Sequence, residues 1–442
     1  MLSAAPAVHA LSGLNREMGS SSTTRTLSAT LISLLLLCSG PAANAGPTLL
    51  KFLKLIDGTG EVLDGREIVV EKGLIIAVGS DLSTMYPNAT KVILDDLYAM
   101  PGLVDVHVHL TYGLSGPSKG DAWKELFATT APERLIAAMR NAKSTLQTGV
   151  TTVRDLFAFE GVDFQLKALI DGDVIPGPRM FITGEAIHPI TMPPHHEGDK
   201  RDLPQEFSRK VEQSIATGAD WIKIFATTGS ADDLNGDQIY FYPEIKAATD
   251  DAHAAGLRVA VHSYSQLAVS DALRAGVDSI EHPVGLDDKL LQQWAQSDAV
   301  YVPTIDHNRY YADHRGEYGY DEKVEAELRE HVIKNIENLR RAHNAGVRVA
   351  MGSDAVMTMF GQNTRELEWF VEAGLTTSET LQAATINGAL LLGQQNRLGR
   401  LQKGFAADII ALKSSPLEDI RALTRNVTWV MKGGQIVHQK EN

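Results

Sequence analysis

Eight short apolar runs, each followed by a stretch with helical periodicity, fill the middle of the chain. They read LVDVHVHL (103–110), VTTVRDL (150–156), RMFITGEAI (179–187), WIKIFA (221–226), RVAVHSY (258–264), SIEHP (279–283), YVPTI (301–305) and RVAMGSD (348–354). Several of the helix-like segments between them end at glycine, as helix C-termini often do. Eight strand-then-helix units over about 300 residues predict an α/β fold, a (β/α)8 TIM barrel. The alternative is an open doubly wound sheet, but no G-x-G-x-x-G follows an early strand.

The two ends of the chain have a different pattern. Residues 46–100 and 404–442 alternate short β-like runs with turns and show no long helical period. We therefore expect a small β-sandwich domain built from both termini, with its N-terminal part at 46–100 and its C-terminal part at 404–442. The barrel would occupy residues 101–403 between them.

Residues 1–45 have the order of a secretory signal peptide. A polar stretch with Arg16 and Arg25 precedes the apolar run LSATLISLLLLCSG, and the small residues Ala43 and Ala45 follow. The apolar run is shorter than the roughly 20 residues that span a bilayer. We expect cleavage after Ala45, a periplasmic or secreted protein, and no membrane contact after cleavage. A lipid anchor at Cys38 is the alternative, although Leu37 before it is larger than such sites usually accept.

Composition limits which residue types can form a catalytic or metal site and which partners are expected. Cys38 is the only cysteine, so the mature chain would have no thiolate to serve as nucleophile or metal ligand. A metal site would have to use His, Asp, Glu or a modified Lys. The formal net charge of −14 argues against a nucleic-acid partner, because such proteins normally present a basic face.

Two histidines stand on one face of the first predicted barrel strand. Side chains on a strand alternate between faces, so His107 and His109 point the same way, into the barrel. Two imidazoles that converge in a crowded interior favour a divalent metal as their partner. Alone, an H-x-H pair is a weak signal.

Polar residues on four other strands strengthen this prediction. Lys223 lies within the fourth strand, and His262, His282 and Asp354 end the fifth, sixth and eighth. Each alone is more often a satisfied buried polar group. Because the strands of a barrel end at one mouth, the whole set predicts a metal centre there.

Lys223 has apolar neighbours, and burial lowers the pKa of an amine. A neutral amine can react with carbon dioxide to form a carbamate, whose two oxygens can bridge two metals. The alternative is a lysine that snorkels to solvent or pairs with a carboxylate.

These motifs resemble the amidohydrolase superfamily. The resemblance rests on VDVHVH, the lysine of strand 4, the histidines that end strands 5 and 6, and the aspartate that ends strand 8. It extends to LIDGTGEVLDGREIVVEKGLIIAVG near the start and GFAADIIALKSSPLEDI near the end. The lysine marks the branch with two metals. HSYSQLAVSDALRAGVDSIEHP resembles imidazolonepropionase-like and Xaa-Pro dipeptidase-like proteins. YVPTIDHNRYYADH and GSDAVMTMFGQNTRELEWFVEAG are most similar to secreted members that hydrolyse ochratoxin-type compounds.

The resemblance implies a role for each residue. His107, His109 and Asp354 would bind one metal, His262 and His282 the other, and carboxylated Lys223 would bridge both. Zinc is the default ion, with manganese or cobalt as alternatives. A hydroxide that bridges the two metals would attack an amide carbon. Asp354 would be the catalytic base that takes its proton and passes it to the leaving amine.

Substrate contacts are expected from loops that follow the strands. Relatives often carry a Gly-Gly-His after strand 3, where this chain has Pro193 and Pro194. The histidine that contacts the substrate carbonyl would then be His195, or alternatively His196; a pair of surface histidines is the other interpretation. Tyr264 resembles a tyrosine that holds the substrate carboxylate in peptidase-like relatives. Those relatives often add an arginine shortly after it, and its absence here puts dipeptide specificity in doubt.

Two further groups could line the pocket. His307 follows strand 7. Met357, Met359 and Phe360 could offer apolar surface beyond strand 8, although such a loop is more often internal packing.

The expected function is a metal-dependent hydrolase of small-molecule amides, acting on an N-acyl amino acid or dipeptide, including ochratoxin-type N-aroyl-phenylalanine. A cyclic amide or lactone hydrolase is the alternative. A non-catalytic relative should have lost ligands, yet all are present here, and a metal-independent lyase or isomerase would leave the H-x-H unexplained. Relatives often form homo-oligomers, so we expect one here.

Overall fold

The computed structural model describes residues 46–114, 116–194, 200–229 and 233–440. The strands of the terminal regions are β1 (Thr48–Leu55), β2 (Glu67–Glu71), β3 (Leu74–Gly79), β4 (Thr90–Pro101), β12 (Ile409–Leu412), β13 (Val427–Lys432) and β14 (Gln435–Gln439). The strands of the middle region are β5 (Leu103–Val108), β6 (Val150–Asp155), β7 (Arg179–Ile182), β8 (Trp221–Phe225), β9 (Arg258–His262), β10 (Ser279–Glu281) and β11 (Val300–Val302).

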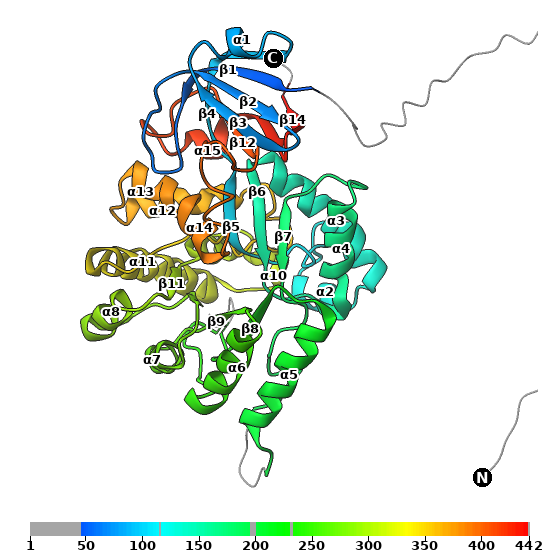
Figure 1. The fold of residues 1–442 in the computed structure, drawn as a ribbon. Helices are drawn as coiled ribbons and strands as arrows, with labels where there is room; N and C mark the ends of the chain where they lie inside the picture. Colours follow the sequence, from blue (N-terminus) through cyan, green and yellow to red (C-terminus); the bar gives the residue numbers. More distant parts are fainter. Residues whose placement is uncertain (1–45, 115, 195–199, 230–232, 441–442) are drawn as a thin grey trace, which may run out of the picture. The chain divides into compact units, whose positions relative to one another are not determined.

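Helices alternate with the strands of the middle region (Figure 1). The α-helices are α1 (Leu82–Met85), α2 (Ala122–Phe127), α3 (Ala131–Gln147), α4 (Val162–Asp171), α5 (Leu203–Thr217), α6 (Tyr242–Ala254), α7 (Gln266–Ala275), α8 (Asp288–Ala295), α9 (Ile305–Asp313), α10 (Arg315–Tyr318), α11 (Glu322–Ala345), α12 (Glu366–Glu372), α13 (Thr377–Ala383), α14 (Ile386–Leu391) and α15 (Ala422–Arg425). Two 3-10 helices, η1 (Phe159–Gly161) and η2 (Asn363–Arg365), complete the set. Among the described residues, no helix is both long enough and apolar enough to cross a membrane.

Helix ends follow from local sequence. Helix α11 starts where the Asp321 side chain accepts hydrogen bonds from two first-turn N–H groups, and it stops at Gly346, whose φ is 90°. Helix α5 starts the same way at Asp202, and Gly218 with φ 89° follows it. A side-chain acceptor satisfies free N–H groups, and glycine adopts the left-handed C-terminal conformation without a steric penalty.

The middle strands are parallel and run in sequence order. One sheet has the order β5-β6-β7 and the other β8-β9-β10-β11, reading the second in chain direction. Single parallel bridges continue between them, from Ile187 to Ile224, from Tyr301 to Val349 and from Val108 to Ala355. Parallel strands in this order bring their carboxyl ends to one side, which is where the site lies.

The eighth predicted strand, residues 348–354, is not a strand in the structure. It contacts its neighbours through the two isolated bridges at Val349 and Ala355. Gly352 lies so close to the first strand that a Cβ there would stand 2.7 Å from the Cβ of His107. Asp354 has a φ of 50°, which breaks the extended conformation. An irregular segment therefore takes the place of the last strand.

Both ends of the described chain contribute to one seven-stranded sheet, in the order β14-β13-β12-β4-β1-β2-β3 (Figure 1). Strand β4 joins the two groups because it pairs with β1 on one side and β12 on the other. Strands from both terminal regions therefore lie in one sheet. The strands form one sheet, so a sandwich of two sheets and the predicted domain boundaries stay predictions.

Candidate metal centre

The six predicted ligands lie together around one cavity. His107 and His109 stand at the end of β5, Lys223 in β8, His262 at the end of β9, His282 directly after β10, and Asp354 in the irregular segment that follows Ala350. Each is at most 7% exposed. Polar residues at the ends of the parallel strands therefore meet at one cavity, as expected from the sequence.

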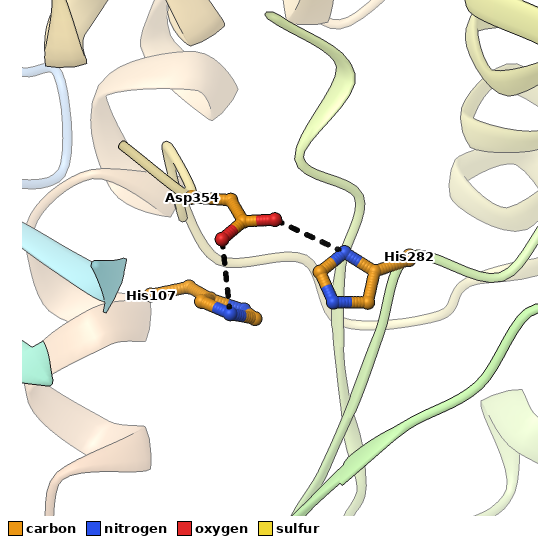
Figure 2. A group of neighbouring side chains, drawn as sticks. All are labelled: His107, His282 and Asp354. Atoms are coloured by element: carbon orange, nitrogen blue, oxygen red, sulfur yellow. Dashed lines mark ion pairs between the residues drawn. The ribbon is translucent and has the colours of Figure 1, made fainter. Parts of the chain in front are cut away.

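Asp354 is the centre of the cluster. Its Oδ1 lies 3.2 Å from His109 Nε2 and 3.5 Å from His107 Nε2. Its Oδ2 lies 3.8 Å from His282 Nδ1 and 3.3 Å from His307 Nε2. Figure 2 shows His107 and His282 on either side of this carboxylate, and one ligand atom from each of the three lies within 4.8 Å of the others.

Two ligands have strained backbones. His282 has a φ of 74° and Asp354 a φ of 50°, values that residues other than glycine rarely adopt. Each such conformation costs on the order of 1–3 kcal/mol and is kept only where the surrounding structure enforces it. These two conformations therefore lower the stability of the fold while they direct the two side chains into the cavity.

Sequence reasoning missed a buried ion pair behind His107. His107 Nδ1 lies 2.9 Å from Glu281 Oε2, and Glu281 Oε1 accepts a 2.9 Å hydrogen bond from Arg154 Nη2. Glu281 and Arg154 are fully buried. A carboxylate acceptor keeps the proton of His107 on Nδ1, so the lone pair of Nε2 faces the cavity.

His282 is oriented in a similar way by Thr304. The hydroxyl of Thr304 donates to the carbonyl of Pro303 at 2.8 Å, so it accepts from His282 Nδ1 at 2.7 Å. The lone pair of His282 then lies on Nε2. His307 Nδ1 donates to the main-chain oxygen of Asp354 at 2.7 Å. These bonds fix the orientation of the two rings.

Several ligand atoms are buried without a hydrogen-bond partner among the described residues. They are His107 Nε2, His109 Nδ1, His262 Nε2 and Lys223 Nζ. Burial lowers the pKa of His107, His262 and His282 well below that of an ordinary histidine. These imidazoles are therefore neutral at pH 7 and keep the lone pair that a metal requires. Unpartnered, neutral nitrogen donors around a carboxylate fit divalent metal ions.

The pKa values of Lys223 and Asp354 are shifted in directions that also suit metal binding. Burial lowers the pKa of Lys223 to about 8, and its Nζ lies over the Phe225 ring, 5.1 Å from the centroid. A substantial neutral fraction is therefore available for reaction with carbon dioxide near neutral pH. Burial opposes ionisation of Asp354, but His307, His107 and His109 hold its pKa well below the ordinary value. Asp354 is therefore a carboxylate.

The cavity measures about 270 Å³, and aromatic side chains make up a large part of its wall. Besides the histidines, the rings that line it are Tyr112, Trp123, Phe127, Phe157, Phe159, Phe225, Tyr264 and Tyr311. Tyr112 and Phe159 are nearly parallel, with centroids 5.7 Å apart. No arginine is among the described lining residues, and Lys223 is the only lysine among them. The wall therefore suits a largely apolar, planar group.

Some of the residues predicted to contact the substrate line the cavity, and others do not or fall outside the described residues. Tyr264 and His307 line the cavity, as expected. His195 and His196 fall outside the described residues. Met357 and Met359 are buried in a hydrophobic cluster, with Phe360 packed against it, and none of the three lines the cavity. The packing interpretation of that loop is the correct one.

Two other lining residues were not singled out from the sequence, His188 and Tyr311. His188 directly follows the third predicted strand, so the rule that found His262 and His282 would also have found it. Tyr311 lies on α9, and no motif marks a residue that reaches the cavity from a helix.

Comparisons with known proteins agree with this geometry. Residues 98–437 match the model of the amidohydrolase family. Ochratoxinase from Aspergillus niger is 30% identical over 420 residues, which cover 86% of this chain and 85% of that protein. An imidazolonepropionase from Kosmotoga olearia is 23% identical and covers 84% of this chain and 90% of its own length.

Solved structures give the same result. A Xaa-Pro dipeptidase with methionine bound in its active site superimposes with a TM-score of 0.79 at 30% identity, covering 89% of this chain and 100% of that one. The A. niger ochratoxinase structure has a TM-score of 0.75 at 26% identity, covering 90% and 96%. These neighbours imply a TIM-barrel α/β fold.

Proposed function

Because this chain belongs to the amidohydrolase family, we propose that it is a metal-dependent hydrolase that cleaves the C–N amide bond of an N-acyl amino acid or dipeptide. The observation that carries the proposal is a buried cluster of neutral nitrogen donors and one carboxylate at the end of an aromatic cavity. The proposed substrates include ochratoxin-type N-aroyl-phenylalanine compounds. The relative from A. niger is named for that activity, which supports this choice.

The donor set supports two divalent ions, zinc by default. His107, His109 and Asp354 would hold one, His262 and His282 the other, and carboxylated Lys223 would bridge both. Lys223 would become a carbamate when its neutral amine adds to carbon dioxide and releases one proton. When bound, such ions supply an acidic water and a positive charge next to the substrate carbonyl.

Asp354 would move the proton of the reaction. Its carboxylate is ionised and central, so it can accept a proton from the attacking water and deliver it to the nitrogen of the leaving amine. His307 Nδ1 donates to the main-chain oxygen of Asp354 at 2.7 Å. This bond would hold the backbone of Asp354 in place during both transfers. No serine or cysteine nucleophile is needed.

The aromatic walls would bind the substrate. An aryl group can stack on rings such as Phe159 and Trp123, and such contacts favour aromatic over aliphatic acyl groups. Tyr264 would donate a hydrogen bond to the carboxylate of the amino-acid part. Without an arginine among the described lining residues, this interaction lacks the bidentate ion pair that an arginine forms with a carboxylate.

The direct test is product analysis by mass spectrometry. Zinc-loaded protein would be incubated with N-aroyl-phenylalanines, Xaa-Pro and other dipeptides, and small lactams and lactones. Release of phenylalanine from the aroyl amides, abolished by chelation and restored by zinc, is the expected result. Ring opening alone would favour the cyclic-substrate alternative, which the imidazolonepropionase relative supports. No cleavage of any amide by metal-loaded protein would refute the proposal.

We also propose that the enzyme acts in the periplasm or outside the cell, after removal of residues 1–45. The leader-like order of charge, apolar run and small residues supports this. N-terminal sequencing of the protein purified from its own host should begin at Gly46. A retained leader, or a lipid on Cys38, would contradict it.

A further inference from the structure

Four aromatic side chains lead from the metal centre toward the surface of the protein. Tyr112 stacks on the predicted ligand His109, with ring centroids 4.8 Å apart, and Phe159 stacks on Tyr112 at 5.7 Å. Phe127 packs edge-on against Phe159 at 5.7 Å, and Trp123 stacks on Phe127 at 6.3 Å. All four line the cavity. We call Tyr112, Trp123, Phe127 and Phe159 the aromatic subsite.

The exposure of these rings increases with their distance from the metal centre. Tyr112 is 7% exposed, Trp123 and Phe159 are half-buried, and Phe127 is 51% exposed. Ile190, which also lines the cavity, is 65% exposed. Exposed apolar residues that adjoin a cavity, unlike ones scattered singly, indicate a ligand-binding surface. The aromatic subsite therefore has a buried inner end and an open, apolar outer end.

Local structure holds the rings in these positions. Trp123 and Phe127 stand four residues apart on α2, so they share one face of the helix. Phe159 lies between two residues other than glycine with positive φ, Phe157 at 152° and Glu160 at 57°. Such backbone conformations are costly, and they cluster at ligand-binding sites where the surrounding structure enforces them. The fold therefore fixes the place of these rings at a cost in stability.

The angles between the rings limit the shape of a ligand. Tyr112 and Phe159 are nearly parallel, at 7°, whereas Phe127 is turned by 76° relative to Phe159. A group that follows the rings outward must therefore change direction at Phe127. A single rigid aryl ring cannot do so, but an aryl ring that carries a flexible apolar chain can. Besides the histidines, Lys223 and Asp354 are the only charged side chains among the described lining residues, so the outer end suits an uncharged group.

The amino-acid end of the proposed substrate has a different place. Tyr264, which would bind its carboxylate, contacts the rings of His262 and His282 at 5.2 and 5.6 Å. The aromatic subsite instead begins at His109, which belongs to the other proposed metal position. An amide carbonyl bound at the centre would therefore direct its carboxylate end toward Tyr264 and its acyl group toward the aromatic subsite.

We propose that the aromatic subsite selects acyl groups in which an aryl ring carries a flexible apolar chain, and that Phe127 binds this chain. This inference rests on the proposed amide hydrolysis and adds to it the class of acyl group. The aryl ring would contact Trp123 and Phe159, and the chain would pass Phe127 toward solvent. A chain in this position is removed from water along its inner part only.

The experiment measures kcat and KM of the zinc-loaded protein for N-benzoyl-phenylalanine and for analogues with a para-ethyl, para-butyl, para-hexyl or para-octyl chain on the benzoyl ring. We expect kcat/KM to rise by about fourfold for each methylene that leaves water, and to level off once the chain passes Phe127. The chain lies far from the reacting carbonyl, so the gain should appear in KM and not in kcat. A constant kcat/KM across the series would overturn the proposal.

Two variants separate binding at the subsite from nonspecific apolar contact. Phe127 and Phe241 are each 51% exposed, but Phe241 does not line the cavity. The measured quantity is the ratio of kcat/KM for the para-hexyl substrate to that for N-benzoyl-phenylalanine. Phe127→Ser should lower this ratio by about 10- to 60-fold, the value of two or three methylenes, and Phe241→Ser should leave it unchanged. Equal ratios in the wild type and Phe127→Ser, or an equal fall in both variants, would overturn the role of Phe127.

Calorimetric binding of the para-alkylbenzoates, which are the acid products, tests the subsite without turnover. The Kd should fall along the series in the wild type, and this fall should be smaller in Phe127→Ser. A wild type that shows this series but hydrolyses no N-acyl amino acid would refute the proposed function and leave the subsite supported. Hydrolysis of N-benzoyl-phenylalanine without any effect of chain length on kcat/KM or Kd would support the proposed function and overturn the subsite. Neither hydrolysis nor an effect of chain length on Kd would overturn both.

Discussion

The two parts of the candidate metal centre differ in how much of their geometry the protein fixes by itself. In the His107 part, which comprises His107, His109 and Asp354, each side chain has a protein contact: Glu281 lies behind His107, and the carboxylate of Asp354 lies 3.2 Å from His109. In the Lys223 part, which comprises Lys223, His262 and His282, the only polar atom of the Lys223 side chain has no hydrogen-bond partner among the described residues.

This difference indicates when each part is completed. The fold orients the His107 part through the bond between His107 and Glu281 and through the left-handed backbone of Asp354. Lys223, in contrast, keeps its amine buried without a partner among the described residues, which is costly unless something binds the amine. Carboxylation of Lys223 and metal binding would supply that partner after folding.

Asp354→Asn should have the largest effect on catalysis, because it removes the proton acceptor while leaving an oxygen ligand in the His107 part. We expect bound zinc to be retained at least in part and kcat to fall by about 100- to 10,000-fold. Steady-state kinetics and elemental analysis on the same preparation would check this. Turnover near the wild-type level would contradict the proton-transfer role.

Lys223→Ala removes the predicted bridge between the two ions and so tests the Lys223 part. We expect the variant to lose binuclear zinc binding and most of its activity, since the bridge between the two ions is gone. A short carboxylic acid such as propionate should restore part of both by filling the space of the carbamate. If Lys223→Ala binds both ions undiminished without rescue, the carbamate assignment is wrong.

Glu281→Gln tests the anchoring of the His107 part. The change leaves Arg154 fully buried without its counter-charge, which should lower the free energy of unfolding by about 3–5 kcal/mol. Zinc affinity should fall by about 10- to 100-fold, because His107 loses its orienting carboxylate. Urea unfolding and zinc titration measure the two effects.

The matched Glu281→Gln, Arg154→Met protein should recover stability but not zinc affinity. Unchanged zinc binding in both proteins would show that Glu281 does not position His107.

Tyr264→Phe should have the smallest effect, because Tyr264 binds no metal in this account. Loss of its single hydroxyl should raise KM for N-benzoyl-phenylalanine by about 10- to 100-fold, the value of one hydrogen bond to a charged group. The kcat and the zinc content should stay near wild-type values. A fall in kcat with unchanged KM would contradict a role limited to substrate binding.

The convergence of the predicted ligands on one cavity could be foreseen from the sequence because a simple rule governs their positions. His107, Lys223, His262 and His282 each stand in or directly after an apolar parallel strand, and such strands end on one side of the fold. Their convergence can therefore be predicted without knowing the distances between segments that lie far apart in the sequence.

Other features depend on three-dimensional contacts that no local pattern encodes. The bond from Arg154 to Glu281 joins residues 127 positions apart, and Tyr311 reaches the cavity from a helix. The irregular course of residues 348–354 was also missed. Its sequence is apolar enough for a strand, but the close approach of Gly352 to His107 and the positive φ of Asp354 prevent one.

Zinc titration of metal-free protein, in carbon-dioxide-depleted buffer and in buffer with bicarbonate, tests the central claim most directly. We expect one tightly bound ion per chain without bicarbonate, held by the His107 part, and a second ion when bicarbonate is present. Two ions bound with the same affinity in both buffers would contradict the view that folding completes one part and carboxylation the other.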